Sequence, residues 1–177
     1  MIHFLIKHLR FFSLLCIIAT MITIFIFSAQ SAQESSELSG KFVEIVIKIF
    51  IPDYNNLSFS EQQKIQEKIS FIVRKTAHFT EFSFLGFFLM LHLITIGNIF
   101  KQIKFKIFLR SIISWFFGTF YAVTDEIHQS FVTNRYSSIK DVFIDSSGVL
   151  FGIFILIILL MFTTKNFYIQ NKKLGND

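Results

Sequence analysis

The sequence predicts an all-α fold: a polytopic membrane protein with about four transmembrane helices and an extracytoplasmic helical loop after the first span. The 177 residues are 53% hydrophobic and only 16% charged, a composition too apolar for a typical soluble domain. The apolar residues also gather into four runs long enough to cross a bilayer. We therefore treat residues 1–177 as one integral membrane domain. The expected spans are residues 11–28, 76–97, 107–124 and 142–162, and the expected loop is residues 30–74.

The first span follows two basic residues, Lys7 and Arg10, and contains no charged side chain. A cleaved secretory signal peptide is the alternative, because the small residues Ser28 and Ala29 come after an apolar core with a basic front. The apolar run is longer than most signal cores, which favours a transmembrane helix. Whether the segment is retained or cleaved stays open.

The loop after the first span contains two expected helices. Residues 41–51 are apolar except for three charged side chains spaced three and four residues apart, which would form one polar stripe ending at Pro52. After a turn, Ser60 with Gln63 matches a capping box at the start of a second helix. Isoleucines follow with helical spacing, so we expect this helix to continue into the membrane.

Polar side chains lie at the outer end of the second span. At 100° per residue, Lys75, His78 and Glu81 fall within an arc of about 120° on one helical face. His92 lies about 21 Å further along the same helix, near the opposite interface, and we interpret it as structural. One face of this span is therefore polar at its mouth.

The third span ends in the sequence DEIHQ. If the helix continues, Asp125, His128 and Gln129 share an arc of about 100°, with Glu126 turned to the side. A hairpin loop containing Arg135 then leads to the fourth span.

The fourth span begins with an acidic stripe. Asp141, Asp145, Gly148 and Gly152 fall within about 60° of one another on a helix. The two glycines form a GxxxG pair, which allows a second helix to approach closely. Because the pair continues the acidic stripe, we expect this face to point inward, and a homodimer through the fourth span is one arrangement that it would permit.

Basic residues indicate the orientation of the chain. The expected inner segments carry 9 of the 17 basic residues, namely Lys7, Arg10, Lys101, Lys104, Lys106, Arg110, Lys165, Lys172 and Lys173. The positive-inside rule then predicts a multi-pass protein of the bacterial cytoplasmic membrane with both termini in the cytoplasm. The net charge is +5, and many of the basic residues flank apolar runs. The expected partners are therefore membrane lipids and not nucleic acid.

Charged groups beside membrane spans are costly, so those at the outer helix ends define a candidate site. Its members are Lys75, His78, Glu81, Asp125, Glu126, His128, Gln129, Arg135, Asp141 and Asp145. The predicted topology places all of them on the outer side, where the second, third and fourth spans converge. The single cysteine, Cys16, offers neither a disulfide nor a cysteine metal site.

Several motifs resemble, in the same order, the motif series of VanZ-like membrane proteins. They are FSAQS after the first span, KTAHFTEFSFLG, FYAVTDEIHQSFV with the following arginine, and DVFIDSSGVLFG. The resemblance covers most of the chain and is specific as a series. The recurring positions of that family correspond here to Lys75, His78, Asp125, Glu126, Gln129, Arg135, Asp141, Asp145 and Gly148. Many members have Pro-Gly before the arginine where this chain has Thr133 and Asn134, which leaves the geometry of that turn in question.

The resemblance implies an envelope-related bacterial membrane protein. The family is named for a protein associated with low-level resistance to the glycopeptide antibiotic teicoplanin, and its biochemical mechanism is not established. Most members lie outside resistance clusters, so the resemblance implies an envelope role more directly than it implies resistance.

Three functions fit the polar cluster. In the first, Lys75 and Arg135 bind an anionic or lipid-linked envelope ligand. In the second, the histidines and carboxylates hold a divalent metal or act as acid and base in hydrolysis or transfer on a lipid-linked substrate. In the third, the charges only fasten helix ends together.

No cofactor is identified, because the sequence has no HExxH or GxSxG motif and no phosphate-binding glycine-rich loop. Whether the protein is an enzyme stays open, and ligand binding is the preferred function.

Overall fold

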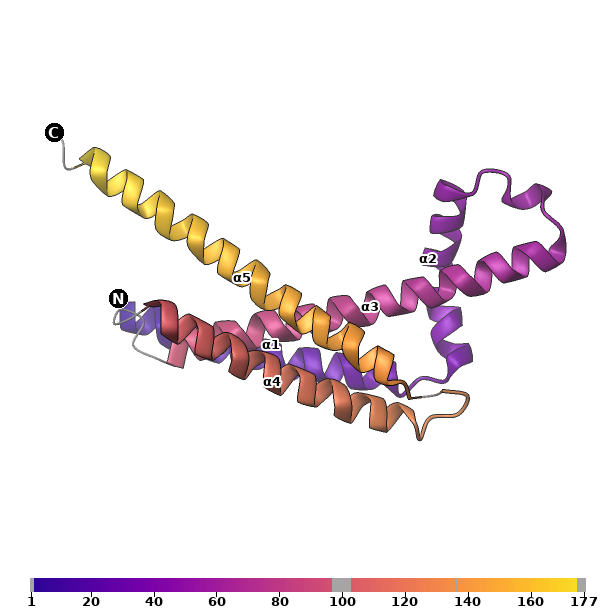
Figure 1. The fold of residues 1–177 in the computed structure, drawn as a ribbon, viewed down its shortest axis with the longest axis horizontal. Helices are drawn as coiled ribbons and strands as arrows, with labels where there is room; N and C mark the ends of the chain where they lie inside the picture. Colours follow the sequence, from indigo (N-terminus) through magenta and orange to yellow (C-terminus); the bar gives the residue numbers. More distant parts are fainter. Residues whose placement is uncertain (1, 97–102, 136, 175–177) are drawn as a thin grey trace.

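The computed structural model describes the backbone of residues 2–96, 103–135 and 137–174. Side-chain burial is described for residues 4–31, 33–96, 107–135 and 137–163. The described residues form helices and no strand, which confirms the predicted fold class. In chain order the elements are α1 (Ile2–Ser28), α2 (Ala32–Phe50), the short 3-10 helix η1 (Tyr54–Asn56), α3 (Phe59–Ile96), α4 (Ile103–Gln129) and α5 (Ile139–Leu174) (Figure 1).

Four of these helices are long and apolar enough to cross a membrane. The segments are Phe4–Ser28, Phe59–Ile96, Ile107–Gln129 and Ile139–Thr163. The second predicted span is the inner part of α3, a continuous helix of 38 residues. At 1.5 Å per residue α3 is about 57 Å long, nearly twice the hydrocarbon thickness of a bilayer. Its first turns therefore extend beyond the apolar layer, and with α2 they form a helical hairpin at one end of the bundle (Figure 1).

Serine and glutamate cap both helices of this hairpin, as a full capping box at α2 and through the Glu61 side chain at α3. At the start of α2, the Glu34 carboxylate accepts the Ser31 N–H at 2.8 Å, while the Ser31 hydroxyl accepts the Glu34 N–H at 3.3 Å. The helix thus begins at Ala32, well before the polar stripe that predicted it. At the start of α3, the Glu61 carboxylate accepts the Ser58 N–H at 3.0 Å. The expected box at Ser60 and Gln63 was therefore wrong by two residues.

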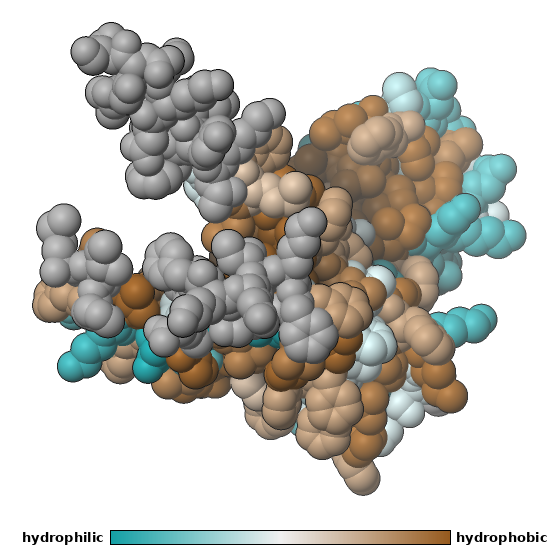
Figure 2. All heavy atoms as spheres, turned by 60° about the vertical axis from the view of Figure 1, so that its left-hand side comes forward, coloured by the Kyte–Doolittle hydropathy of each residue, from teal (hydrophilic) through white to brown (hydrophobic). Residues whose placement is uncertain are grey.

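Helix α3 is central, because it contacts α1, α2, α4 and α5. The core is built mainly from its buried residues and those of α1 and α5: Ile17, Ile24, Phe82, Leu85, Met90, Ile94, Ala122, Val149, Ile153 and Leu156. Large apolar side chains such as Phe116, Phe154 and Phe162 instead face outward. Hydrophobic residues cover most of the coloured face in Figure 2, as expected of a surface in contact with lipid.

The GxxxG pair of α5 packs against α3. A Cβ atom at Gly148 would lie 2.5 Å from the carbonyl oxygen of Phe79, and one at Gly152 would overlap the carbonyl of Ser83. The two backbones are therefore in direct contact within one chain. A homodimer through the fourth span stays a prediction, and it would need a face of α5 other than this one.

Candidate functional site

The ten residues of the predicted site lie at one end of the helix bundle, where α1, α3, α4 and α5 meet. Helix α3 carries Lys75, His78 and Glu81, and the last turns of α4 carry the DEIHQ sequence. The first turns of α5 carry Asp141 and Asp145, next to the α4–α5 loop. Helix α1 also ends here, and the structure sorts the ten side chains into groups with different surroundings.

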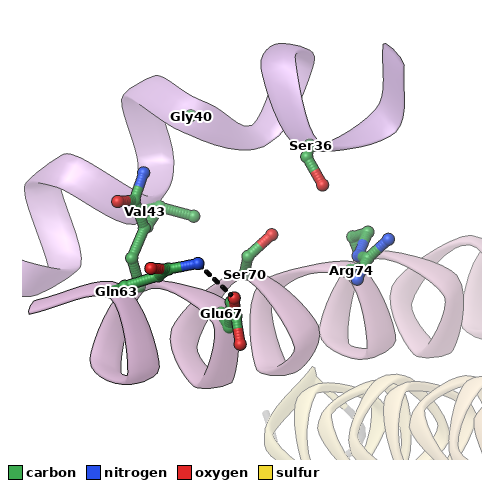
Figure 3. A pocket seen from close by; sticks show the side chains of 8 residues that line it. Ser36, Gly40, Val43, Gln63, Glu67, Ser70 and Arg74 are labelled. Carbon is green, nitrogen blue, oxygen red and sulfur yellow. Dashed lines mark hydrogen bonds between the residues drawn. The ribbon is translucent and has the colours of Figure 1, made fainter. Parts of the chain in front are cut away.

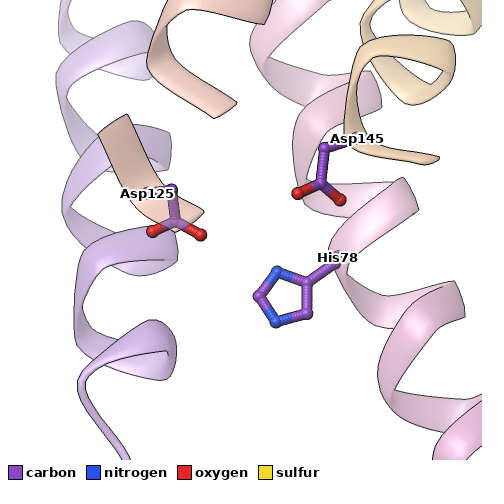
Figure 4. A group of neighbouring side chains, drawn as sticks. All are labelled: His78, Asp125 and Asp145. Atoms are coloured by element: carbon purple, nitrogen blue, oxygen red, sulfur yellow. The ribbon is translucent and has the colours of Figure 1, made fainter. Parts of the chain in front are cut away.

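The most deeply buried group joins three helices. Each of His78, Asp125 and Asp145 offers one potential ligand atom, and these atoms all lie within 4.8 Å of one another. Figure 4 shows the imidazole and the two carboxylates pointing toward a common space. Asp125 is 3% exposed and Asp145 is 2% exposed. An imidazole and two buried carboxylates facing one another are suited to hold a cation or to share protons.

Asp125 is held in place by a hydrogen-bond network. Its Oδ2 accepts the hydroxyl of Ser28 at 2.8 Å and the side-chain amide of Gln129 at 2.8 Å. The amide oxygen of Gln129 accepts an N–H of Arg135 at 3.1 Å, and the same guanidinium donates to the carbonyl of Phe27 at 3.2 Å. The network therefore connects the end of α1, the end of α4 and the α4–α5 loop.

Three members of the predicted site contact the loop side of the cluster. Lys75 forms an ion pair with Asp141, which joins α3 to the first turn of α5. Glu126 accepts the backbone N–H of Ser138 at 2.8 Å and so joins the end of α4 to the start of α5. These contacts join α3, the end of α4 and the start of α5.

His128 is not one of the three residues whose potential ligand atoms come together. Its ring stacks on Phe25 of α1, with centroids 4.4 Å apart and an angle of 16° between the planes. The Nδ1 atom of His128 is buried without a hydrogen-bond partner. The structure thus separates this histidine from His78, with which sequence reasoning had grouped it.

Two members of the buried triad, His78 and Asp145, and the neighbouring Glu81 have polar side-chain atoms without a hydrogen bond. His78 Nδ1 and Glu81 Oε2 are buried without hydrogen bonds, and they lie 3.9 Å from each other. The carboxylate of Asp145 has no hydrogen bond or ion pair within the part of the chain that the structure describes. Buried polar groups are rarely left unsatisfied, so each of these needs a physical reason.

A cavity of about 250 Å³ lies beside the triad, and we call it the cation cavity. It is lined by Arg74, Lys75, His78, Gln129, Arg135 and Asp141. Burial, with a smaller contribution from neighbouring Arg74, lowers the pKa of the Arg135 guanidinium from its usual value. Both arginines line this cavity, and like charges in one cavity repel each other.

Further openings lie between α2 and α3. A cavity of about 320 Å³, the α2–α3 cavity, is lined largely by apolar groups, including those of Phe27, Leu38 and Phe42, and it also reaches Arg74, His78 and Glu81. A third cavity, of about 300 Å³, lies further out along the hairpin, and Figure 3 shows Ser70 and Arg74 on its α3 side. All three cavities share Arg74.

Sequence reasoning missed two residues of this site. Arg74 directly precedes Lys75, and its position in the basic RKTAH sequence was the available signal. Ser28 was considered as part of a signal-peptide cleavage site and of the FSAQS motif, and nothing local indicated its bond to Asp125.

The turn before Arg135 contains a left-handed residue. Asn134 has a φ of 59°, a conformation that asparagine tolerates better than most residues other than glycine. Asn134 can therefore serve where many VanZ-like proteins have glycine, which answers the question that this departure raised.

Comparison with known proteins identifies the family. The family model described as VanZ/LLP1 matches residues 12–161, which include every residue of the candidate site. Neither the curated proteins nor the solved structures contain a significant match. The long match, which spans all four membrane helices, shows that this chain is a membrane protein that belongs to the VanZ/LLP1 family.

Proposed function

We propose that the protein binds an anionic, lipid-linked ligand of the bacterial envelope in the cation cavity, at the outer face of the cytoplasmic membrane. The observation that carries this proposal is the charge of the cavity lining. Three cationic side chains, Arg74, Lys75 and Arg135, face a space of about 250 Å³ that one carboxylate, Asp141, also lines. That carboxylate is engaged by Lys75, which leaves the two arginines without a carboxylate partner there.

The two arginines are suited to a phosphate or carboxylate group. The side chain of Arg74 has no hydrogen bond or ion pair among the described residues. The guanidinium of Arg135 is oriented by Gln129 and by a backbone carbonyl, and it still has N–H groups to donate. An anion between them would accept charge-assisted hydrogen bonds and offset their mutual repulsion.

A neighbouring apolar cavity supports a ligand that is part lipid. The lining surface of the α2–α3 cavity is mainly apolar, and this cavity shares Arg74 and His78 with the cation cavity. An amphiphile could place its charged head between the arginines and its first apolar atoms between α2 and α3. The basic flanks of the expected inner segments support the outward orientation of both cavities.

Hydrolysis or transfer on a lipid-linked substrate is the second candidate function. The buried group of His78, Asp125 and Asp145 favours it, because such groups can provide acid, base or metal chemistry. A purely structural role explains Lys75, Asp141 and Glu126, all of which join helices. It does not explain the unpaired His78, Glu81 and Asp145.

Lipid binding by purified protein tests the proposal. In detergent, native mass spectrometry would compare dioleoyl phosphatidic acid with dioleoyl phosphatidylcholine as probes of the anionic head. We expect a preference for phosphatidic acid and a loss of affinity of about 10- to 100-fold in Arg74→Gln, because one charge-assisted hydrogen bond contributes about 1.5 to 3 kcal/mol. The matched control is Lys68→Gln, which removes an exposed charge from the same helix outside the three cavities described above.

Equal affinities of Arg74→Gln and Lys68→Gln for phosphatidic acid would refute the cation cavity as the binding site. A link to teicoplanin is tested separately, by expressing the wild type and Arg74→Gln in a teicoplanin-susceptible host. If binding and resistance are connected, only the wild type should raise the inhibitory concentration. Resistance that persists in a variant unable to bind lipid would separate the two properties.

A further inference from the structure

The unpaired groups beside the cation cavity indicate a second ligand. We propose that His78, Asp125 and Asp145 form a binding site for one divalent transition-metal cation, with the Glu81 carboxylate beside it. This inference stands on the buried group itself and does not depend on whether the cation cavity binds a lipid.

The geometry is close to that of a metal site. One atom from each residue lies within 4.8 Å of the other two. Three ligand atoms spread evenly at about 2.0–2.2 Å around a common ion are about 3.3–3.8 Å apart. Reaching that spacing requires each ligand atom to move by less than about 1 Å, and Figure 4 shows the three groups already directed at one another.

The pattern of satisfied and unsatisfied atoms also fits a cation. Asp145 is 2% exposed and has no partner within the described residues, although it points into this group. His78 Nδ1 is likewise buried and unpaired, and so is Glu81 Oε2, 3.9 Å away. A cation held by His78, Asp125 and Asp145 would supply the missing partner of the Asp145 carboxylate. Lys75 cannot do so, because it is paired with Asp141 at the rim.

Asp125 has neighbouring hydrogen bonds of the kind that orient a metal ligand. Its Oδ2 accepts from Ser28 and Gln129, whereas no described hydrogen bond uses Oδ1. One oxygen is thus anchored and the other is free to face the ion. Metal-binding carboxylates and histidines are commonly oriented by a surrounding hydrogen-bond shell of this kind.

The ligand types indicate which metals to test. One imidazole and two or three carboxylates favour Zn²⁺ or Mn²⁺ over Ca²⁺ and Mg²⁺, which prefer all-oxygen sites. Three protein ligands would leave at least one coordination position for another group. His78 also lines the cation cavity, so an ion at this site would border the space where we propose that an anion binds.

Metal titration of the full-length protein tests the site. Protein purified in detergent is first treated with a chelator and then titrated with Zn²⁺ by calorimetry, and Co²⁺ absorption reports the coordinating atoms. We expect one equivalent per chain in the wild type. Asp145→Asn should weaken Zn²⁺ binding at least tenfold and change the Co²⁺ spectrum. This variant keeps the shape of the side chain and breaks no described hydrogen bond, so it should fold.

Two matched variants serve as controls. Asp53→Asn removes an exposed carboxylate from the α2–α3 hairpin, and His92→Gln removes a histidine whose Nδ1 is bonded to Ser13. Both should bind Zn²⁺ as the wild type does. Less than one equivalent in the wild type, or equal affinity in Asp145→Asn and Asp53→Asn, would overturn the metal site.

Arg74→Gln distinguishes this inference from the lipid-binding proposal, because it should retain Zn²⁺ while losing affinity for phosphatidic acid. If no Zn²⁺ binds but Arg74→Gln still weakens lipid binding, only the metal site is wrong. If Zn²⁺ binds and the two lipids bind equally, only the lipid proposal is wrong.

Discussion

Replacing Gly148 by alanine should weaken the contact between α3 and α5. The added Cβ atom would lie 2.5 Å from the Phe79 carbonyl oxygen, and real Cβ atoms essentially never come closer than 3.0 Å to such an atom. The added Cβ atom would therefore be too close to this oxygen by at least 0.5 Å. Because a helical carbonyl cannot rotate away, α5 itself has to move. A gap of that size already loses a quarter or more of the dispersion energy of the atoms around it.

Gly40→Ala is the control that isolates this effect. Gly40 lies in α2, and a Cβ atom there would meet nothing within 4 Å. Both substitutions gain about 0.5 to 1 kcal/mol of helix propensity, so this gain cancels when the two variants are compared. The remaining difference is the cost of overpacking, which is about 1 to 3 kcal/mol. Gly148→Ala should therefore be less stable than Gly40→Ala by about that amount.

Unfolding in mixed micelles can measure this difference through fluorescence. The chain has a single tryptophan, Trp115, and its indole N–H donates to Ser146 of α5 at 2.8 Å. Its emission thus reports the packing of α4 against α5. Gly152→Ala should be less stable still, since its Cβ would overlap the Ser83 carbonyl. A Gly148→Ala variant as stable as Gly40→Ala would refute the close packing of α5 on α3.

Two further predictions concern charges on either side of the site. Lys75→Met leaves the Asp141 carboxylate, which is only 17% exposed, without its cationic partner. The free energy of unfolding should fall by about 1 to 2 kcal/mol. Adding Asp141→Asn to this variant should recover most of the loss. Hydrogen bonds from the Ser31 backbone N–H and hydroxyl lower the pKa of Glu34. The stability that the ionised carboxylate gives to α2 is therefore fully present above the ordinary glutamate pKa, and it is lost as pH falls through the lowered pKa. The protection factors of the amides in the first turn of α2, measured by hydrogen exchange, should therefore fall at acid pH in the wild type and stay constant in Glu34→Gln, and an equal fall in both would count against the cap.

The fold could be predicted largely from composition and hydropathy, whereas the helix limits could not. Four apolar runs indicated four spans because the bilayer requires a minimum length of apolar helix. Hydropathy does not register where a helix continues beyond the apolar layer, and the continuity of α3 was predicted instead from the helical spacing of its isoleucines. The start of α2 was missed although Ser31 and Glu34 have capping-box spacing, because the surrounding residues are polar and lack an apolar period.

The site could be located from the sequence, but its internal arrangement could not. Positions on a helical wheel show which residues share a face of one helix, and they do not fix how that helix is rotated against its neighbours. His128 and Asp125 share such a face, yet the histidine stacks on Phe25 while the aspartate joins His78 and Asp145. That difference depends on where α1 packs, and helix packing in membranes is set by side-chain fit along the whole helix.

Cationic and anionic groups in this site occupy different positions relative to the helices. The cation cavity next to the α4–α5 loop is lined by Arg135 and by Lys75, which is paired with Asp141. By contrast, Asp125 and Asp145 are almost completely buried. If the cluster served only to join helix ends, direct pairing of the buried acids with these cations would be the cheaper arrangement, because an unpaired buried charge is expensive. The chain instead leaves Asp145 unpaired beside an unpaired imidazole. That separation is expected of a site whose acids and cations each bind something the chain does not itself supply.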